Sequence, residues 1–180
     1  MGYKYIRTYT GKEFYPMDPQ PKAIDIRDIA HALSLVCRGN GHVNRFFSVA
    51  QHCINCALEA EARGYSTRVI MACLLHDASE AYMSDVPRPF KQFLGEYMKQ
   101  EESLLELIYS KFLGSTLTEE EQKLLKQIDD DLLYFDLREL LNEPQDKPEP
   151  EIHIEINYEF TPFIEVEQKY LELYEKWRLL

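Results

Sequence analysis

The sequence contains no long apolar stretch, which argues against helices that span a membrane. A membrane-spanning helix needs roughly 18 or more consecutive apolar residues, whereas charged residues interrupt every helical segment of this 180-residue chain. The first five residues, Met1 to Tyr5, also lack the apolar centre of a signal peptide. We therefore expect a cytoplasmic protein that has no membrane partner.

Cysteine is scarce as well. The chain has only four cysteines, and all of them lie in or beside apolar helical segments. In a reducing compartment such residues are typical of small buried hydrophobic side chains rather than of a disulfide framework. They are Cys37, Cys53, Cys56 and Cys73.

Positive charge is in short supply. The chain has 20 Lys and Arg residues against 31 Asp and Glu residues, a net charge of −11. Because duplex binding depends on Lys and Arg that neutralise phosphates, we do not expect a nucleic-acid partner. Residues 1–50 nevertheless carry seven basic and four acidic residues. If the substrate is an anion, its positive contacts should come mainly from this N-terminal part and from a metal ion.

The pattern that is present is helical. Apolar residues recur at helical spacing through most of the chain, which predicts an all-α fold. Residues 69–75 are all apolar, which is typical of a helix buried on every side. Thr118 and Glu121 have the spacing of a capping box at the start of a helix. We expect about six helices, over residues 25–36, 48–63, 66–80, 93–113, 118–141 and 162–179.

The length allows a single domain with a substantial core. Residues 1–23, rich in Tyr, Pro and charge, predict an ordered N-terminal arm, and residues 24–141 predict the main helical domain. Residues 142–150 contain three prolines and predict a loop. Residues 151–160 alternate between apolar and polar, which is the only strand-like signal in the chain. We expect residues 142–180, with their loop, extended segment and final helix, to pack on the same domain.

Ionisable residues directly follow the apolar segment. His76 and Asp77 stand at its end, although ionisable groups are rarely buried without partners. Glu80 lies one helical turn beyond His76, and Asp85 follows in the next loop. These carboxylates would repel one another unless a bound cation or a role in proton transfer relieved the repulsion. Taken alone, each feature also fits a plainer interpretation, in which His76 caps a helix and the carboxylates form a solvated acidic loop.

Two other predicted helices add candidates. His52 lies in the helix over 48–63, where a single histidine is more often an ordinary core or surface residue. Asp129, Asp130 and Asp131 would usually be a solvated run of charge. By helical phase, however, Asp129 borders the apolar face, while Asp130 and Asp131 point outward. At least one of these carboxylates can therefore face the core.

The order of these residues, a His, then a His-Asp pair, then an Asp on three helices, resembles the HD-domain superfamily of metal-dependent phosphohydrolases. Several segments are similar to its deoxynucleotide-hydrolysing branch, which includes bacterial deoxynucleoside 5′-monophosphatases and phage dATP triphosphohydrolases. They are Ser48-Val49-Ala50-Gln51-His52, Leu75-His76-Asp77-Ala78-Ser79-Glu80, Asp85-Val86-Pro87-Arg88-Pro89-Phe90-Lys91 and Lys126-Gln127-Ile128-Asp129. The resemblance covers approximately residues 24–141, which it identifies as an HD phosphohydrolase domain, and it does not extend beyond Pro144.

The resemblance implies a site for one divalent metal ion, in which Glu80 and Asp85 orient or deprotonate the attacking water. Its ligands would be His52, His76, Asp77 and Asp129. A mixed set of two imidazoles and two carboxylates suits Mn²⁺, Fe²⁺, Co²⁺, Ni²⁺ or Zn²⁺ better than Mg²⁺. Four protein ligands also leave coordination positions for water and a phosphate oxygen.

Substrate contacts implied by the resemblance lie nearer the N-terminus. Arg38 would bind phosphate, and His42 and Lys91 are further candidates for substrate binding. The sequence departs from the pattern directly after Arg38, where the monophosphatases usually have Trp and this chain has Gly39. Recognition of the base and the sugar is therefore left open.

We expect an enzyme that hydrolyses deoxynucleotides, with conversion of a deoxynucleoside 5′-monophosphate to deoxynucleoside and phosphate as the first hypothesis. Release of triphosphate from a deoxynucleoside triphosphate is the alternative. A homodimer or larger homo-oligomer is also expected, because residues 151–160 and the last helix offer apolar surface.

Two other classes of function compete with this hypothesis. Cys53 and Cys56 beside His52 would suit a structural zinc site, but the chain lacks the second cysteine pair that such sites usually have. A non-catalytic helical module that binds a metal or a nucleotide is the other alternative. The complete set of ligands, together with two extra carboxylates, argues against it.

Overall fold

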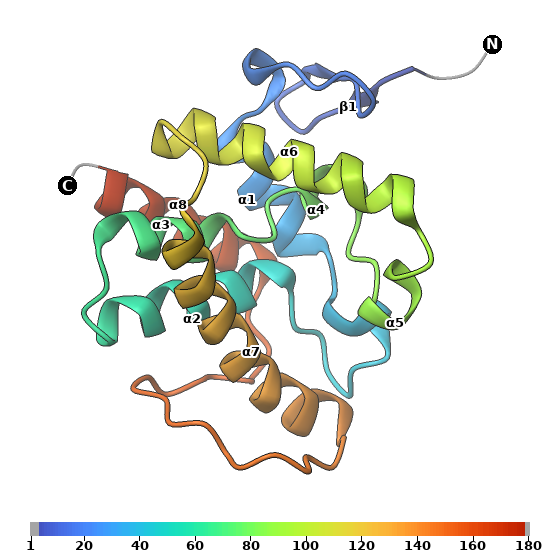
Figure 1. The fold of residues 1–180 in the computed structure, drawn as a ribbon. Coiled ribbons are helices and arrows are strands. Elements are labelled where there is room, and N and C mark those ends of the chain that lie inside the picture. Colours follow the sequence, from blue (N-terminus) through green and yellow to red (C-terminus); the bar gives the residue numbers. More distant parts are fainter. Residues whose placement is uncertain (1–3, 179–180) are drawn as a thin grey trace.

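Helices make up the body of the protein in the computed structural model, which describes residues 4–178 (Figure 1). Six helices of nine or more residues lie in this range, and two four-residue helices, α4 (Glu80–Met83) and α5 (Arg88–Lys91), lie between α3 and α6. The long ones are α1 (Ile26–Leu35), α2 (Val49–Ala62), α3 (Thr67–Leu75), α6 (Gly95–Leu113), α7 (Glu119–Leu141) and α8 (Phe163–Arg178). The expected all-α class is confirmed. Within the described range, no helix is both long enough and apolar enough to cross a bilayer.

The core is organised around α2 and α3, which pack closely against each other. The helices α1, α7 and α8 pack on α2, while α6, α7 and α8 pack on α3. All seven residues from Val69 to Leu75 are buried, as their uninterrupted apolar character predicts. Because the last turns of α3 are held inside the core, the polar residues that follow begin at depth rather than at the surface.

Side-chain caps fix where the principal helices begin. Asp25 precedes α1 and accepts a hydrogen bond from the amide of Arg27. Thr118 and Glu121 form the predicted capping box at the start of α7. Ser48 and Gln51 form a second capping box at the start of α2, the helix that carries His52. A cap of this kind contributes about 1 kcal/mol to helix stability.

The predicted helix over 66–80 is wrong at its C-terminal end. The helix α3 ends at Leu75, and residues 76–79 form turns before α4 begins. The amides of Ala78 and Glu80 donate to the carbonyls of Leu75 and Asp77, with an N···O distance of 2.9 Å in both bonds. Each bond joins residues three apart, as in a 3₁₀ helix, instead of four apart, as in an α-helix. This break frees His76 and Asp77 from the 100° separation that adjacent residues have on an ideal helix.

The N-terminal arm is ordered over its described residues and holds the only sheet in this part of the chain. Strands β1 (Ile6–Arg7) and β2 (Glu13–Phe14) pair antiparallel, with Ile6 opposite Phe14, and a short 3₁₀ helix, η1 (Pro21–Ala23), follows. Phe14 is fully buried, and its ring stacks on Tyr82 of α4 at a centroid distance of 4.1 Å. The strands therefore lie in the arm rather than at the alternating segment.

Residues 151–160 are extended chain without a strand partner in the described structure. The alternation still describes their burial, because Ile152, Ile154, Ile156 and Tyr158 are half-buried while the residues between them are exposed. Ile152 and Ile156 pack on the hydrophobic core. One side of this extended segment thus contacts side chains of the helical body instead of pairing with another strand.

The C-terminal helix closes the structure. The helix α8 packs on α1, α2 and α3, and it buries Tyr170 and Trp177 almost completely. The predicted end of this helix, near Leu179, lies outside the described residues. Large apolar side chains remain exposed at its N-terminal end, namely Phe160, Phe163 and Ile164. The oligomer that the sequence predicts for this region stays a prediction.

Candidate metal centre and substrate pocket

Three helices bring the four expected metal ligands to one place. His52 lies on α2, His76 and Asp77 follow directly after α3, and Asp129 lies on α7. Both histidines are buried, and the two carboxylates are half-buried and line a pocket. Each backbone position thus belongs to, or adjoins, a long helix that is packed in the core.

The distances between the ligand atoms suit a shared cation. His52 Nε2 lies 3.1 Å from Asp129 Oδ1. His76 Nε2 lies 3.3 Å from Asp77 Oδ2 and 3.8 Å from the same Asp129 oxygen. Ligand atoms that bind an ion at about 2.1 Å and at right angles are about 3 Å apart. These three pairs are therefore spaced nearly as neighbouring ligands of one ion would be, although among the described residues the four side chains do not form one group whose donor atoms all lie within 4.8 Å of one another.

The opposite ring nitrogens of both histidines are anchored. His76 Nδ1 lies 2.7 Å from the carbonyl oxygen of Cys73, and His52 Nδ1 lies 2.9 Å from Asp136 Oδ2. A carbonyl can only accept, so His76 Nδ1 carries a proton and donates it. This arrangement orients Nε2 toward a metal, as in many histidine ligands.

His76 Nε2 itself is buried and has no hydrogen-bond partner within the described structure. An unsatisfied buried polar atom costs about 1–3 kcal/mol. A divalent cation bound between the imidazoles and carboxylates would satisfy this nitrogen. Buried groups of His, Cys and Asp residues at this place could therefore hold a metal ion.

Electrostatics keep both ligand carboxylates ionised. Burial alone would raise the pKa of Asp77, but the charges of His76, His52 and Arg38 outweigh it and lower that pKa to about 2. Burial also opposes ionisation of Asp129, yet the hydrogen bond from His52 and the charge of His76 hold its pKa well below the ordinary value. Two anionic carboxylates thus lie near the same imidazole nitrogen, His76 Nε2.

The same contacts raise the pKa values of the two histidines. Burial lowers the pKa of His76, but the charge of Asp77 more than compensates and raises it well above 6.5. Burial and the charge of Arg38 lower the pKa of His52. Cys56, Asp129 and Asp136 raise it by more, so the net pKa lies well above 6.5. A metal ion that binds here has to displace protons from the imidazoles.

Glu80 and Asp85 lie beside the ligands and line the same pocket. Glu80 begins α4, is buried, and its Oε2 has no hydrogen-bond partner within residues 4–178. Burial, followed by the charges of Asp77 and Asp85, raises the pKa of Glu80 well above 4.5. Burial also raises the pKa of Asp85, against the effect of Arg38. A carboxylate with a raised pKa is a competent proton acceptor near neutral pH.

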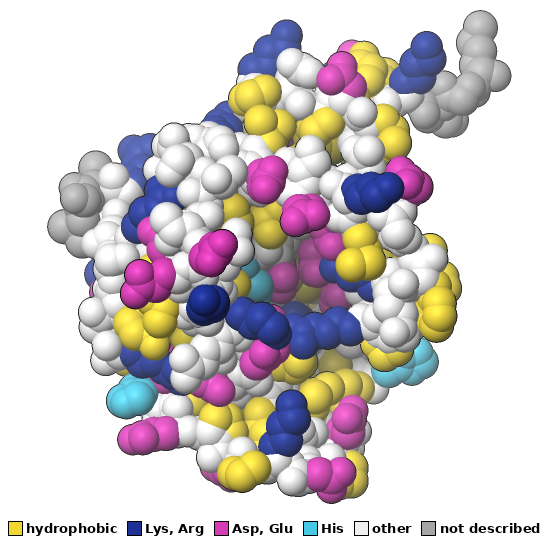
Figure 2. Space-filling view, viewed as in Figure 1, with side chains coloured by type: hydrophobic (Ala, Val, Ile, Leu, Met, Phe, Trp, Pro, Cys, Tyr) yellow, Lys and Arg dark blue, Asp and Glu magenta, His cyan; other side chains and the backbone are white. Residues whose placement is uncertain are grey.

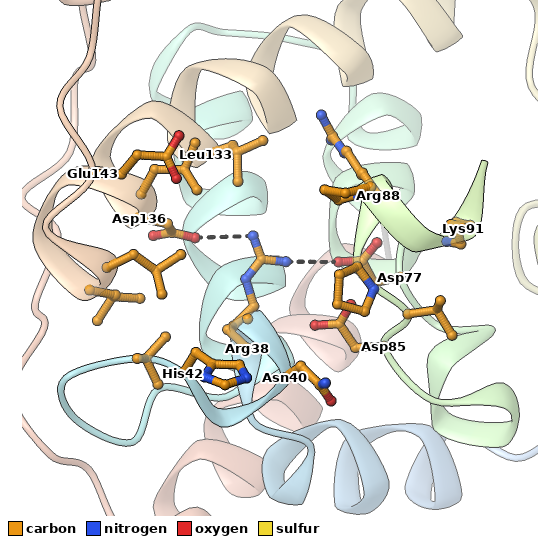
Figure 3. Close-up of a pocket in the computed structure, with 18 of the residues that line it drawn as sticks. Arg38, Asn40, His42, Asp77, Asp85, Arg88, Lys91, Leu133, Asp136 and Glu143 are labelled. Atoms are coloured by element: carbon orange, nitrogen blue, oxygen red, sulfur yellow. Dashed lines mark hydrogen bonds and ion pairs between the residues drawn. The ribbon is translucent and has the colours of Figure 1, made fainter. Parts of the chain in front are cut away.

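Arg38 enters the pocket from a sharply turned segment. It begins the 3₁₀ helix η2 (Arg38–Gly41), in which Gly39 and Asn40 both have positive φ, 58° and 53°. Its guanidinium lies between two carboxylates, with Nη1 3.5 Å from Asp77 Oδ2 and Nη2 3.2 Å from Asp136 Oδ2 (Figure 3). These contacts fix the group in place and leave other N–H donors for a ligand.

The weaker substrate candidates are less closely integrated. His42 is exposed at the edge of the pocket, and its side chain makes no hydrogen bond among the described residues. Lys91 lines the pocket, but its Nζ is paired with Glu101 Oε2 at 2.7 Å. Both side chains are near enough for a role in binding, but neither is aimed at the ligand cluster by a contact of its own.

Arg88 is a cation of the pocket to which the sequence assigned no role, although it lies within the recognised Pro-Arg-Pro segment. Its Nη2 lies 2.7 Å from Asp129 Oδ2, and its Nη1 lies 3.3 Å from Asp130 Oδ1. The side chain is 59% exposed. Its guanidinium therefore reaches the second oxygen of the Asp129 carboxylate while remaining open to solvent.

The pocket is a cavity of about 720 Å³ with two chemically different sides. Figure 2 shows the hollow, with acidic side chains inside it and a row of basic side chains across it. One side carries the ionisable residues described above. The other side is richer in apolar side chains, with Asp136 and Glu143 among them (Figure 3); these apolar residues are Val43, Leu133, Leu137, Leu140 and Leu141.

Asp136 is a further residue of the pocket that was not predicted from the sequence. It lies on α7 seven residues after Asp129, a spacing of almost two full helical turns, so both carboxylates share one face. That repeated spacing on an otherwise apolar face was the signal that could have revealed it.

Two buried cysteines, Cys53 and Cys56, lie near the predicted metal ligands. Cys56 Sγ is 3.5 Å from His52 Nε2, and His52, Cys56 and His76 form one group whose donor atoms are close enough to share an ion. Cys53 forms a similar group with His76 and Asp77. Burial raises the pKa of Cys53, which disfavours the thiolate that a metal requires. A mixed Cys and His site is therefore the structural alternative to the predicted ligand set.

Comparison with known proteins gives relatives without an assigned activity. No family model matches the chain. The chain is 38% identical over 108 residues to the uncharacterized protein YfdR of Escherichia coli (strain K12), a match that covers 60% of this chain and 58% of that protein. It is 35% identical over 111 residues to an uncharacterized protein of Rhodobacter capsulatus, covering 59% and 57% of the two chains. The chain thus matches less than two thirds of the length of these relatives.

Proposed function

We propose that this protein is a metal-dependent phosphohydrolase of the HD type that acts on deoxynucleotides, with a deoxynucleoside 5′-monophosphate as the first candidate substrate. The observation that carries the proposal is the convergence of two anchored imidazoles and two ionised carboxylates, with an unsatisfied His76 Nε2 among them. Mn²⁺, Fe²⁺, Co²⁺, Ni²⁺ and Zn²⁺ suit this ligand set.

When bound, such an ion supplies a Lewis acid that withdraws charge from the phosphate and acidifies water. Arg38 binds the phosphate oxygens through its free N–H groups and stays charged at any working pH. Glu80 accepts a proton from the attacking water, whose oxygen forms the new bond to phosphorus. The bond from phosphorus to the 5′ oxygen breaks, and that oxygen takes up a proton to give the nucleoside and phosphate. Asp85 orients the water.

The two-sided pocket supports a nucleotide rather than a purely ionic phosphate. The ionisable side would hold the phosphate, while the leucine-rich side would take the apolar faces of the sugar and base. Arg88 at the outer edge supplies a specific reason to keep the triphosphate alternative, because it adds positive charge beyond Arg38.

The test is product analysis with purified protein, Mn²⁺, Co²⁺ or Mg²⁺, and panels of deoxynucleoside monophosphates and triphosphates. The controls are His76→Ala and Asp77→Ala. Deoxynucleoside and inorganic phosphate would support the 5′-nucleotidase, whereas deoxynucleoside and triphosphate would support the triphosphohydrolase. If no metal gives either product, while the wild type binds metal and the variants do not, the nucleotide assignment fails and the non-catalytic metal-binding module is favoured.

The position of Cys56 makes the cysteine-ligated alternative worth a separate experiment. Alkylation of the native protein by iodoacetamide, with and without a chelator, distinguishes the two ligand sets. If Cys56 binds zinc, chelation should expose it to alkylation. If the ligands are His52, His76, Asp77 and Asp129, we expect the rate of alkylation to be insensitive to the chelator.

A further inference from the structure

Asp136 of α7 joins three parts of the site that are far apart in the sequence. The residue is 4% exposed, and its carboxylate contacts a residue of α2, a residue of η2 and a residue of the C-terminal extended segment. Within the proposed function, we infer that Asp136 and Tyr158 are positioning residues that hold the metal ligand His52 and the phosphate-binding Arg38 in one fixed relation.

The two oxygens of the Asp136 carboxylate have different partners. Oδ2 lies 2.9 Å from His52 Nδ1 and 3.2 Å from Arg38 Nη2. Oδ1 accepts a hydrogen bond from the Tyr158 hydroxyl at 3.0 Å. Because one oxygen serves both the imidazole and the guanidinium, a rotation of the carboxylate would move both groups together.

Tyr158 has the contacts needed to prevent that rotation. Its ring lies 5.3 Å from the ring of Phe47, which is fully buried directly before the cap of α2. Ile156, two residues earlier on the same side of the extended segment, packs on the core. The hydroxyl is therefore held by the packing of its own segment, rather than by Asp136 alone.

This geometry gives the tail a role in the site. Tyr158 lies in the segment for which the sequence supplied no functional indication, yet it reaches the shell of residues directly behind a metal ligand. Partners in this position commonly change metal affinity by 10- to 100-fold when they are removed. The shared oxygen also predicts that metal binding and phosphate binding weaken together.

The test uses Tyr158→Phe, Asp136→Asn and the double variant, with Co²⁺ alone and then inorganic phosphate in the presence of Co²⁺ as probes. Tyr15→Phe is the matched control, because its hydroxyl also donates to a carboxylate, Glu13 Oε2 at 3.1 Å, on the exposed arm. Arg38→Gln is the reference for a loss of phosphate binding alone. Calorimetry measures both affinities, and circular dichroism verifies that each variant is folded.

We expect Asp136→Asn to weaken Co²⁺ binding by about 10- to 100-fold and Tyr158→Phe to weaken both probes by a smaller factor. The double variant should bind as Asp136→Asn does, because Tyr158 acts through that carboxylate. The inference is overturned if Tyr158→Phe binds both probes like Tyr15→Phe, or if the losses add fully in the double variant.

If Asp136→Asn does not fold, the comparison of Tyr158→Phe with Tyr15→Phe still decides. Neither probe contains a nucleoside, so an absence of nucleotide hydrolysis would overturn the proposed function and leave this inference standing. A wild-type protein that binds no Co²⁺ would overturn both.

Discussion

The inner and outer halves of the proposed site are built differently. The inner half, with His52, His76 and Asp129, is carried by long helices or their ends, and both histidines are anchored through Nδ1. The outer half, with Arg38 and Arg88, is carried by the short helices η2 and α5. Core packing therefore fixes the place of the chemistry, while the outer cations lie on short helices and are held by carboxylate partners.

The largest effect should come from the inner half. We expect His76→Ala to remove metal binding and to reduce hydrolysis to background, because it deletes a ligand whose backbone cannot shift to compensate. Cys56→Ser is the control, since it changes a nearby donor that the proposed set does not use. Metal content after dialysis measures metal binding, and the rate of hydrolysis measures activity. If Cys56→Ser loses the metal and His76→Ala keeps it, the ligand assignment is wrong.

Glu80 lies between the two halves, and its loss should separate chemistry from binding. Glu80→Gln keeps the shape of the side chain but removes its ability to accept a proton, so we expect kcat to fall by about 10²- to 10⁴-fold. Metal affinity should change little. Equal losses of metal affinity and of kcat would show that Glu80 belongs to the ligand set instead.

Metal binding by the inner half should depend steeply on pH. The raised pKa values mean that His52 and His76 are protonated below those values, and a metal needs neutral imidazoles. Affinity should therefore rise with pH and continue to rise above pH 6.5, by up to about tenfold per pH unit for each proton released. Calorimetry in buffers of different ionisation enthalpy counts these protons. A count of zero at pH 6.5 would contradict the expectation.

In the outer half, substitution should tune binding rather than abolish activity. We expect Arg88→Gln to raise KM about tenfold, since a hydrogen bond to a charged group contributes about 1.5–3 kcal/mol, and to leave kcat nearly unchanged. Lys126→Gln is the control, because Lys126 also pairs with Asp130 but does not line the pocket. A larger rise in KM for triphosphates than for monophosphates would favour the triphosphate alternative. Equal effects of both variants would remove Arg88 from the binding site.

The sequence predicted the long helices of the site better than the turns between them. Helical periodicity predicted the long helices, because burial of apolar side chains dominates their formation. The placement of Asp129 toward the apolar face also follows from phase, and the structure sets its Oδ1 beside His52. Periodicity carries no information on turns, and the residues that follow Leu75 are compatible with a helix, so the end of α3 at Leu75 could not be predicted from the sequence.

Contacts between distant segments account for the rest. The role of Asp136 depends on Arg38 and Tyr158, which lie 98 and 22 residues away in the sequence. The alternation over 151–160 indicated one buried side but not whether a strand or a helical surface would cover it. Here the helical body covers it, and the paired strands formed instead in an arm whose sequence has no clear period.

The smallest expected effect concerns the turn at Gly39. It tests whether this turn affects substrate binding as well as stability. Gly39→Ala places a Cβ at φ 58°, 3.3 Å from Val43 Cγ1, whereas Gly64→Ala places one at φ 72° with no atom within 4 Å. Both should destabilise by about 1–2 kcal/mol, which thermal unfolding measures. Only Gly39→Ala should also raise KM, because Arg38 is its neighbour. An unchanged KM in both variants would show that the turn does not position the guanidinium.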